Sequence, residues 1–309
     1  MNNILAVVVT YNRRTLLEEC INALLQQSMK RFDILIVDNA STDDTSNLCC
    51  RYVQEYDNII YENTGKNIGG AGGFQFGMRY GVEKGYNFFW VMDDDTIAEC
   101  VALEELWKAH ERLNGEYGFL SSAALWSDRT LCKMNTPGMN DSFDYEEYCK
   151  IKDGLIRIER ATFVSLFVKR ETVEKIGLPI KDFFIWCDDI EFTNRISKQY
   201  KSYFVVRSRV LHKMKKNVGS DISTDDVERV PRYYYEYRNF AYIAKQNGML
   251  WKLYQLYRFG HNLVNITKYS KNKRMLRYKI VFKGYFSGLL FNPEVEYVAY
   301  KEMNDCDLL

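Results

Sequence analysis

Short apolar runs alternate with segments of helical spacing over roughly the first hundred residues. Four runs are apolar enough for buried strands: 4–9, 32–38, 58–61 and 87–92. Helical spacing lies between them at 15–27, from a cap at Thr42 or Asp43 to Tyr56, and at 74–83 after the glycine loop 65–73. This alternation predicts an α/β fold with a mostly parallel sheet flanked by helices.

The second half of the chain predicts further strands and then helices. Strands are expected at 118–126, 160–170 and 202–211, and helices at 172–176 and 189–199. Residues 213–228 are polar and contain glycine, which is typical of a loop or lid. After Pro231 the apolar residues repeat at helical spacing. We therefore expect an α/β domain at 1–230 and a helical C-terminal region at 231–309.

Charge distinguishes these two regions. The net charge of the 309-residue chain is +1, but residues 232–292 hold twelve Lys and Arg against one acid, Glu236. The remainder holds 30 bases and 40 acids. A basic and aromatic surface suits an anionic membrane. The alternative is a helical subdomain that packs its aromatic rings on the α/β domain and leaves its bases solvated; a homo-oligomer is compatible with both.

Other partners and compartments are less favoured. Single-stranded nucleic acid could bind bases and stacked rings, but we expect no nucleic-acid partner. The eight cysteines form no C-x-x-C pair, which indicates reduced thiols rather than a disulfide framework or a zinc site. No run approaches ~18 apolar residues, and the N-terminus lacks the basic start of a signal peptide. We expect a cytoplasmic protein that is peripheral on the inner face of the cell membrane.

Polar side chains gather where the predicted strands end. Asn12, Asp38, Asn67 and Asp93 each lie at or just beyond such an end. Ligands of parallel α/β sheets bind at the carboxyl ends of the strands, so one cleft could hold all four residues.

Three adjacent carboxylates, Asp93-Asp94-Asp95, follow the apolar run 88–92. Their mutual repulsion would be relieved by a hard cation, and Mg²⁺ or Mn²⁺ accepts one or two carboxylates together with phosphate oxygens. A solvated turn before the next helix is the alternative for an isolated acidic run. Its position after a buried strand favours the cation site.

The glycine segment Gly69-Gly70-Ala71-Gly72-Gly73 has two interpretations. It does not match the dinucleotide-binding fingerprint, because Gln75 stands where a glycine is required, and it lacks the ending of a P-loop. A helix that begins with glycines still suits a diphosphate or a sugar. The alternative is a flexible turn before a helix.

A second acidic group, Asp188-Asp189-x-Glu191, follows the aromatic run 183–186. A carboxylate beside Trp186 would be partly desolvated, which raises its pKa and suits a general base. A helix cap is the alternative, and it is compatible with catalysis. Of the three histidines, His212 ends a predicted strand and could bind a metal or lie in the core, whereas His110 and His261 are interpreted as structural.

The ordered set of motifs resembles the family 2 glycosyltransferases with the GT-A fold. The matching segments, within roughly 4–212, are Val8-Val9-Thr10-Tyr11-Asn12, Val37-Asp38-Asn39-Ala40-Ser41-Thr42-Asp43, Asn67-Ile68-Gly69-Gly70, Asp93-Asp94-Asp95 and Cys187-Asp188-Asp189-Ile190-Glu191. More specifically, residues 67–74 together with Arg232-Tyr233-Tyr234-Tyr235 and Arg238-Asn239 resemble galactofuranosyltransferases of cell-wall and polysaccharide synthesis. Rhamnosyltransferases share most of the broader set.

The resemblance implies a role for each matched residue. The nucleotide-sugar donor would contact Thr10, Tyr11, Asp38, Asn67, Gly69, Gly70, Asp93 and Asp94. The metal, Mn²⁺ or Mg²⁺, would be held by Asp93, Asp95 and His212. Asp189 would be the catalytic base, with Asp188 as the alternative, and Trp186 would form a wall on the acceptor side.

The implied reaction is the inverting transfer of galactofuranose from UDP-galactofuranose to a glycan or a polyprenyl-linked glycan. The chain begins directly at its first strand, so we expect single additions rather than processive polymerisation. A rhamnosyltransferase that uses dTDP-rhamnose is the alternative enzyme. A non-catalytic carbohydrate-binding or assembly protein on the same fold is the alternative of another class.

Overall fold

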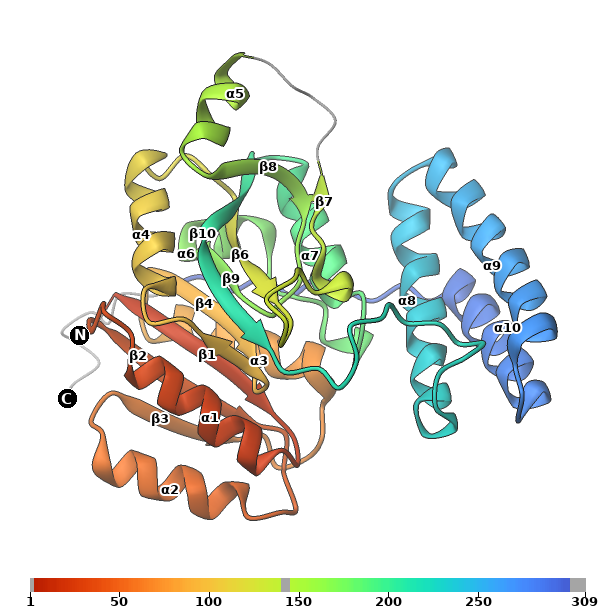
Figure 1. Cartoon of the computed structure of the whole chain (residues 1–309), viewed down its shortest axis with the longest axis horizontal. Coiled ribbons are helices and arrows are strands. Elements are labelled where there is room, and N and C mark those ends of the chain that lie inside the picture. The colour runs from red at the N-terminus through yellow and green to blue at the C-terminus, as the bar shows by residue number, and fades with distance from the viewer. Residues whose placement is uncertain (1–2, 140–144, 301–309) are drawn as a thin grey trace.

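A computed structural model describes residues 3–139 and 145–300 of the chain. Its single large sheet has the strand order β3-β2-β1-β4-β9-β6-β10-β8-β7, with β5 paired to β10 (Figure 1). The strands are β1 (Ile4–Thr10), β2 (Phe32–Asp38), β3 (Ile59–Asn63), β4 (Phe88–Asp93), β5 (Thr96–Ala98), β6 (Phe119–Leu125), β7 (Gly138–Met139), β8 (Leu155–Arg160), β9 (Leu166–Lys169) and β10 (Ser202–His212).

Helices cover both faces of the sheet. They are α1 (Arg14–Leu25), α2 (Thr45–Glu55), α3 (Gly69–Glu83), α4 (Ala102–Arg112), α5 (Tyr145–Lys152), α6 (Arg170–Ile176) and α7 (Asp188–Ser197). Short 3-10 helices lie at Lys133–Asn135, Lys181–Phe183 and Val227–Arg232. The predicted α/β class, with a helix-flanked sheet, is confirmed.

Successive side chains of β1 point alternately into two hydrophobic cores, one on each face of the sheet. Ile4, Ala6 and Val8 pack with α1, α2 and α4, whereas the intervening side chains pack with α3, α6 and α7 on the other face. This alternation follows from the pleat of a strand that is buried on both sides, and it explains the continuous apolar run.

The first half of the sheet is parallel, and the second half is mixed. Strands β3, β2, β1 and β4 are parallel neighbours, whereas β9 is antiparallel to both β4 and β6. The chain leaves β1 toward β2 on one side and reaches β4 on the other, so a topological switch point lies between β1 and β4. Ligands of such sheets bind outside the carboxyl ends of the strands at this point.

Two predicted segments are wrong in detail. The glycine segment is not a loop that precedes the helix, because α3 already begins at Gly69. The single strand expected at 160–170 is replaced by β8 and β9 with a turn between them. The other predicted strands and helices are confirmed to within a few residues.

The C-terminal helices α8 (Tyr233–Gln246), α9 (Met249–Tyr269) and α10 (Arg274–Leu290) pack together beside the sheet (Figure 1). The chain then returns to the α/β domain, where Glu296 accepts hydrogen bonds from Gln75 and Arg79 on α3. No helix in the described part of the chain has the length and apolar character needed to cross a membrane.

Candidate active site

The ends of β1 and β4 meet at the switch point. The hydroxyl of Thr10, the last residue of β1, donates a 2.8 Å hydrogen bond to Oδ2 of Asp94. Both side chains are almost fully buried. The parallel register of the two strands therefore brings the first and fourth predicted motifs into contact at the expected edge of the sheet.

Asp93, Asp95 and His212 form a cluster that could hold a metal ion. One ligand atom from each lies within 4.8 Å of the others. Asp93 ends β4 and His212 ends β10, so two separate strands deliver them to the same place. Carboxylate and imidazole ligands in this number fit a divalent cation that keeps positions open for phosphate oxygens.

The hydrogen bonds of His212 determine which ring nitrogen faces this cluster. Asn135 donates its amide to Thr162, so its oxygen accepts from Nδ1 of His212 at 2.8 Å. In the neutral ring Nε2 then carries only a lone pair, and it points at Oδ1 of Asp95 from 3.2 Å. That oxygen is buried and has no hydrogen-bond partner in the described chain. Two electron pairs that face each other require a cation or a proton between them, so the cluster fits a metal ion.

The three neighbouring aspartates differ in electrostatic environment. Burial, reinforced by Asp95, raises the pKa of Asp93 well above its usual range. Burial also raises the pKa of Asp94 to about 6, although Arg13 opposes this. Burial would raise the pKa of Asp95 too, but His212 in its protonated form and Arg13 outweigh it and the pKa is lowered. Crowded carboxylates of this kind are stabilised as anions when a cation binds.

Arg13, which belongs to no predicted site, also contacts the acidic cluster. Its guanidinium lies 2.6 Å from Asp95 and 3.1 Å from Asp94. Burial opposes its charge, but the neighbouring aspartates raise its pKa above the ordinary value. The available signal was its place directly after Asn12, at the end of a strand that leads into the predicted cleft.

The residues predicted to bind the nucleotide base lie along the neighbouring strand ends. Asp38 is buried, and its carboxylate accepts hydrogen bonds from Tyr61 at 2.8 Å and from the backbone nitrogen of Ser41 at 2.9 Å. Tyr11 is 42% exposed and free to pack against a ligand. Asn12, at a φ of 54°, accepts from the backbone of Thr42, which ties the loops after β1 and β2 together.

Asn67 and the glycines at the start of α3 form a tight turn. The side-chain oxygen of Asn67 accepts a 2.9 Å hydrogen bond from the nitrogen of Gly69. Gly69 has a φ of 76°, and a Cβ built there would lie 2.0 Å from the backbone oxygen of Phe184. Gly70 has no atom within 4 Å of its Cβ position. Gly69 is thus needed for close approach, whereas the space at Gly70 is open for a ligand.

Asp188 and Asp189 begin α7, and Cys187 separates them from the half-buried Trp186. Burial raises the pKa of both carboxyls, and their proximity raises that of Asp188 further. Oδ1 of Asp189 accepts from the nitrogen of Ile190 at 2.7 Å, but Cys187 occupies the N-cap position of α7 and no side chain caps the helix there, so the expected cap by an acid is wrong. A carboxylate whose pKa lies closer to neutrality is better suited to accept a proton.

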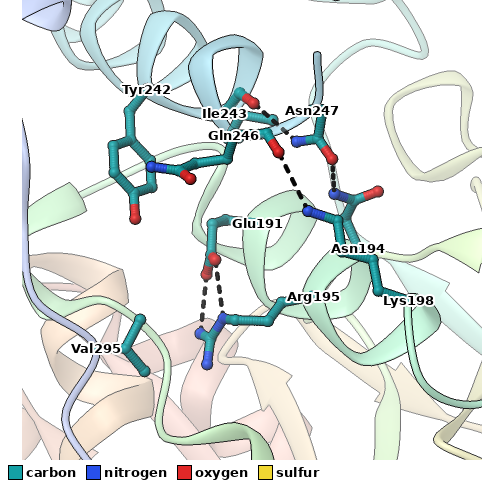
Figure 2. A pocket seen from close by; sticks show the side chains of 9 residues that line it. All are labelled: Glu191, Asn194, Arg195, Lys198, Tyr242, Ile243, Gln246, Asn247 and Val295. Carbon is teal, nitrogen blue, oxygen red and sulfur yellow. Dashed lines mark hydrogen bonds and ion pairs between the residues drawn. The ribbon is translucent and has the colours of Figure 1, made fainter.

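Glu191 does not belong to this group. Its two carboxylate oxygens form a bidentate salt bridge with Nε and Nη2 of Arg195, at 2.8 and 2.9 Å, on the side of α7 that faces α8. Figure 2 shows this pair in a pocket that is also lined by Tyr242 of α8 and by Asn247, which follows that helix. The volume of the pocket is about 120 Å³. The pair joins α7 to its surroundings, since Arg195 also donates to the backbone oxygens of Ile176, Gly177 and Leu178.

Arginine side chains lie beside both the aspartate cluster and Trp186. Arg229 lies 5.9 Å from the centre of the Trp186 ring. Burial, together with the like charges of Arg229 and Arg13, lowers the pKa of Arg232. Arg13, which contacts Asp95, is therefore close enough to Arg232 to sense its charge. Positive side chains beside an acidic group suit a diphosphate.

Comparison with known proteins identifies the class of domain. Residues 5–118 match the family described as "Glycosyl transferase family 2", the family that the sequence motifs resemble. The galactofuranosyltransferase GlfT1 of Mycolicibacterium smegmatis is 24% identical over 265 residues, which cover 79% of this chain and 83% of that protein. A poly(ribitol-phosphate) beta-glucosyltransferase of Bacillus spizizenii is 30% identical over 29% of this chain and 14% of its own length.

Solved structures show the same fold. The mannosyltransferase PcManGT of Pyrobaculum calidifontis, solved with GDP-Man and Mn²⁺, superposes with a TM-score of 0.57 at 16% identity. The superposition covers 93% of this chain and 87% of that one. The structure thus has the predicted GT-A fold, and the match of residues 5–118 confirms the resemblance to family 2 glycosyltransferases.

Proposed function

We propose that this glycosyltransferase is metal-dependent and inverts the anomeric centre of galactofuranose as it moves the sugar from UDP-galactofuranose to a glycan. The observation that carries the proposal is the buried, unpartnered Oδ1 of Asp95, which faces the lone pair of His212 beside Asp93. The 24% identity to GlfT1, over most of both chains, supports the choice of sugar.

The proposed roles of the residues follow from their positions. Asp93, Asp95 and His212 would hold Mn²⁺ or Mg²⁺, which supplies positive charge for the diphosphate leaving group. Arg13 and Arg232 add fixed positive charge on the same side. Thr10, Tyr11 and Asp38 line the pocket for the base, and Asn67, Gly69 and Gly70 lie beside the donor sugar, with Asp94 held against Thr10.

Asp189 is the proposed base, with Asp188 as the alternative. It accepts the proton of the acceptor hydroxyl as that oxygen attacks the anomeric carbon opposite the departing diphosphate. Trp186 forms a wall for the acceptor sugar. Burial raises the pKa of Asp189. Because this carboxyl lies in the first turn of α7, the helix dipole stabilises the carboxylate anion once it has formed.

A thermal-shift panel of nucleotide sugars, with and without Mn²⁺, tests the donor and the metal together. UDP-galactofuranose should stabilise the protein only when Mn²⁺ is present. Stabilisation by dTDP-rhamnose instead would support the rhamnosyltransferase. No stabilisation by any donor, and no donor hydrolysis, would support a non-catalytic carbohydrate-binding protein.

We also propose that the acceptor is lipid-linked and that the protein works as a peripheral protein on the inner face of the cell membrane. Thirteen of the twenty-two exposed large hydrophobic side chains of the described chain lie within residues 249–290. Residues 237–293 contain no Asp or Glu but eleven Lys and Arg. Exposed apolar side chains among unopposed bases suit an anionic lipid surface. A second copy of the chain would bring the same positive charge to this face, which disfavours self-association there.

A further inference from the structure

The segment that leads into the two candidate base residues has an unusual backbone. Phe184, Trp186 and Cys187 have φ angles of 65°, 65° and 68°. Phe184 is the centre of a three-residue turn, in which the nitrogen of Ile185 donates to the oxygen of Phe183 at 2.8 Å. Bulky L-residues avoid this conformation, so it persists only where surrounding groups hold it.

The main support of this segment is the side chain of Asn239 on α8, which binds it through hydrogen bonds. Asn239 is fully buried, and its position lies outside the region matched by the family. Its side-chain nitrogen donates to three backbone oxygens, those of Phe183, Ile185 and Trp186, at 3.0, 3.2 and 2.9 Å. Its side-chain oxygen accepts from Nε of Arg238 at 3.0 Å, which fixes the amide with its donors toward the segment. Arg238 also donates to the oxygens of Asp182 and Phe183.

The opposite side of the segment rests on the donor side of the site. The oxygen of Phe184 accepts from the nitrogen of Ala71 at 3.2 Å and occupies the space that a Cβ of Gly69 would need. The Phe184 ring stacks on Tyr235 of α8 at 4.9 Å. The segment is therefore clamped between the glycines of α3 and the first C-terminal helix.

We propose that Asn239 is a positioning residue that holds residues 183–187 in this conformation and thereby aims Trp186 and the Asp188-Asp189 pair at the acceptor. The inference rests on the proposed function for the identity of the base. It makes the C-terminal helical region part of the active site through hydrogen bonds rather than through contact with substrate. A carboxylate in place of the amide keeps the shape but turns the donors into acceptors that face three carbonyl oxygens.

The test compares Asn239→Asp and Asn239→Ala with Asn262→Ala. Asn262 also donates its amide to one backbone oxygen in the helical region, that of Arg258, but it does not touch the segment. Both Asn239 variants should lose about 10- to 100-fold in kcat, because small misplacements of a reacting group have effects of that size. Donor affinity should stay within about twofold of wild type. Hydrogen exchange should accelerate in peptides that cover 182–190 and stay unchanged in β1 and α9.

Two results would overturn the proposal. One is a kcat of the Asn239 variants close to that of wild type and the Asn262 control. The other is hydrogen exchange that rises throughout the protein, which would mark a general loss of stability. Arg238→Gln removes a weaker part of the same clamp and should shift both readouts in the same direction if the Asn239 variants do not fold. Hydrogen exchange needs no substrate, so a wild-type protein without transferase activity would refute the proposed function separately.

Discussion

Nε2 of His212 lies 3.2 Å from Oδ1 of Asp95 while the other ring nitrogen is committed to Asn135. This relationship makes His212→Ala and Asp95→Asn the sharpest tests of the metal. Each should abolish the thermal stabilisation by Mn²⁺ with UDP and lower kcat by orders of magnitude. Asn135→Ala frees the ring and should weaken Mn²⁺ binding by about 10- to 100-fold. Activity that survives chelation in the wild-type protein would contradict the metal role.

The two adjacent candidate bases can be separated by mutation. Asp189→Asn should bind UDP-galactofuranose normally yet lower turnover by about 10²- to 10⁴-fold, because no group remains to accept the proton. Asp188→Asn should have a smaller effect. Donor affinity by calorimetry and turnover with acceptor are the measurements. Near-normal turnover of Asp189→Asn together with loss of turnover in Asp188→Asn would transfer the role to Asp188.

The pH dependence follows from the raised pKa of both carboxyls. A base works only when it is deprotonated, so activity is present above its pKa and is lost as the pH falls through it. Burial raises that pKa, and the acidic limb of kcat/KM should therefore lie above the value of about 4 expected for an exposed aspartate. A profile measured with saturating Mn²⁺ checks this. A limb that stays near pH 4 would show that the base is not desolvated.

Local pattern was enough to predict the first four strands and their polar ends, because a strand buried on both faces is apolar throughout. It failed at the start of α3, since glycine is a poor helix former. The glycines there are selected by packing. A Cβ at Gly73 would lie 2.5 Å from Val9, and one at Gly77 would lie 2.3 Å from Val7. Only the folded sheet makes this requirement visible.

In the candidate site, too, the motif residues could be predicted from the sequence, whereas the residues that hold them in place could not. Asp93, Asp95 and His212 were predicted to share a metal, and the structure brings them together as a possible metal-binding group. The partners that orient them were not predictable, because His212 and Asn135 are 77 residues apart and neither lies in a motif. The hydrogen bonds that hold residues 183–187 could not be predicted for a similar reason, because nothing in the sequence indicates that an aromatic residue such as Phe184 has a positive φ.

Arg232 should contribute to donor binding. Its side chain reaches the solvent, but partial burial and the like charges of Arg229 and Arg13 lower its pKa, so an anion between these arginines would relieve their repulsion. Arg232→Ala should raise the KM for the donor by about tenfold, a loss that fits one charged hydrogen bond. The effect should shrink at high salt. Steady-state kinetics measure it, with the exposed Arg31→Ala as the control, and an equal change in both variants would contradict the role.

The apolar face of α9 should decide membrane binding. Leu250 and Leu253 are 80% and 56% exposed there, and replacing both with Asp puts negative charge among the lipids and removes apolar contact. Sedimentation with phosphatidylglycerol vesicles should capture wild type and lose about tenfold or more of the double variant. Val53→Asp, an equivalent change on exposed α2, should behave as wild type. If wild-type protein does not sediment with anionic vesicles, membrane binding is refuted and the face is solvated. If wild type is a dimer that only the α9 variant disrupts, the face is instead a site of self-association.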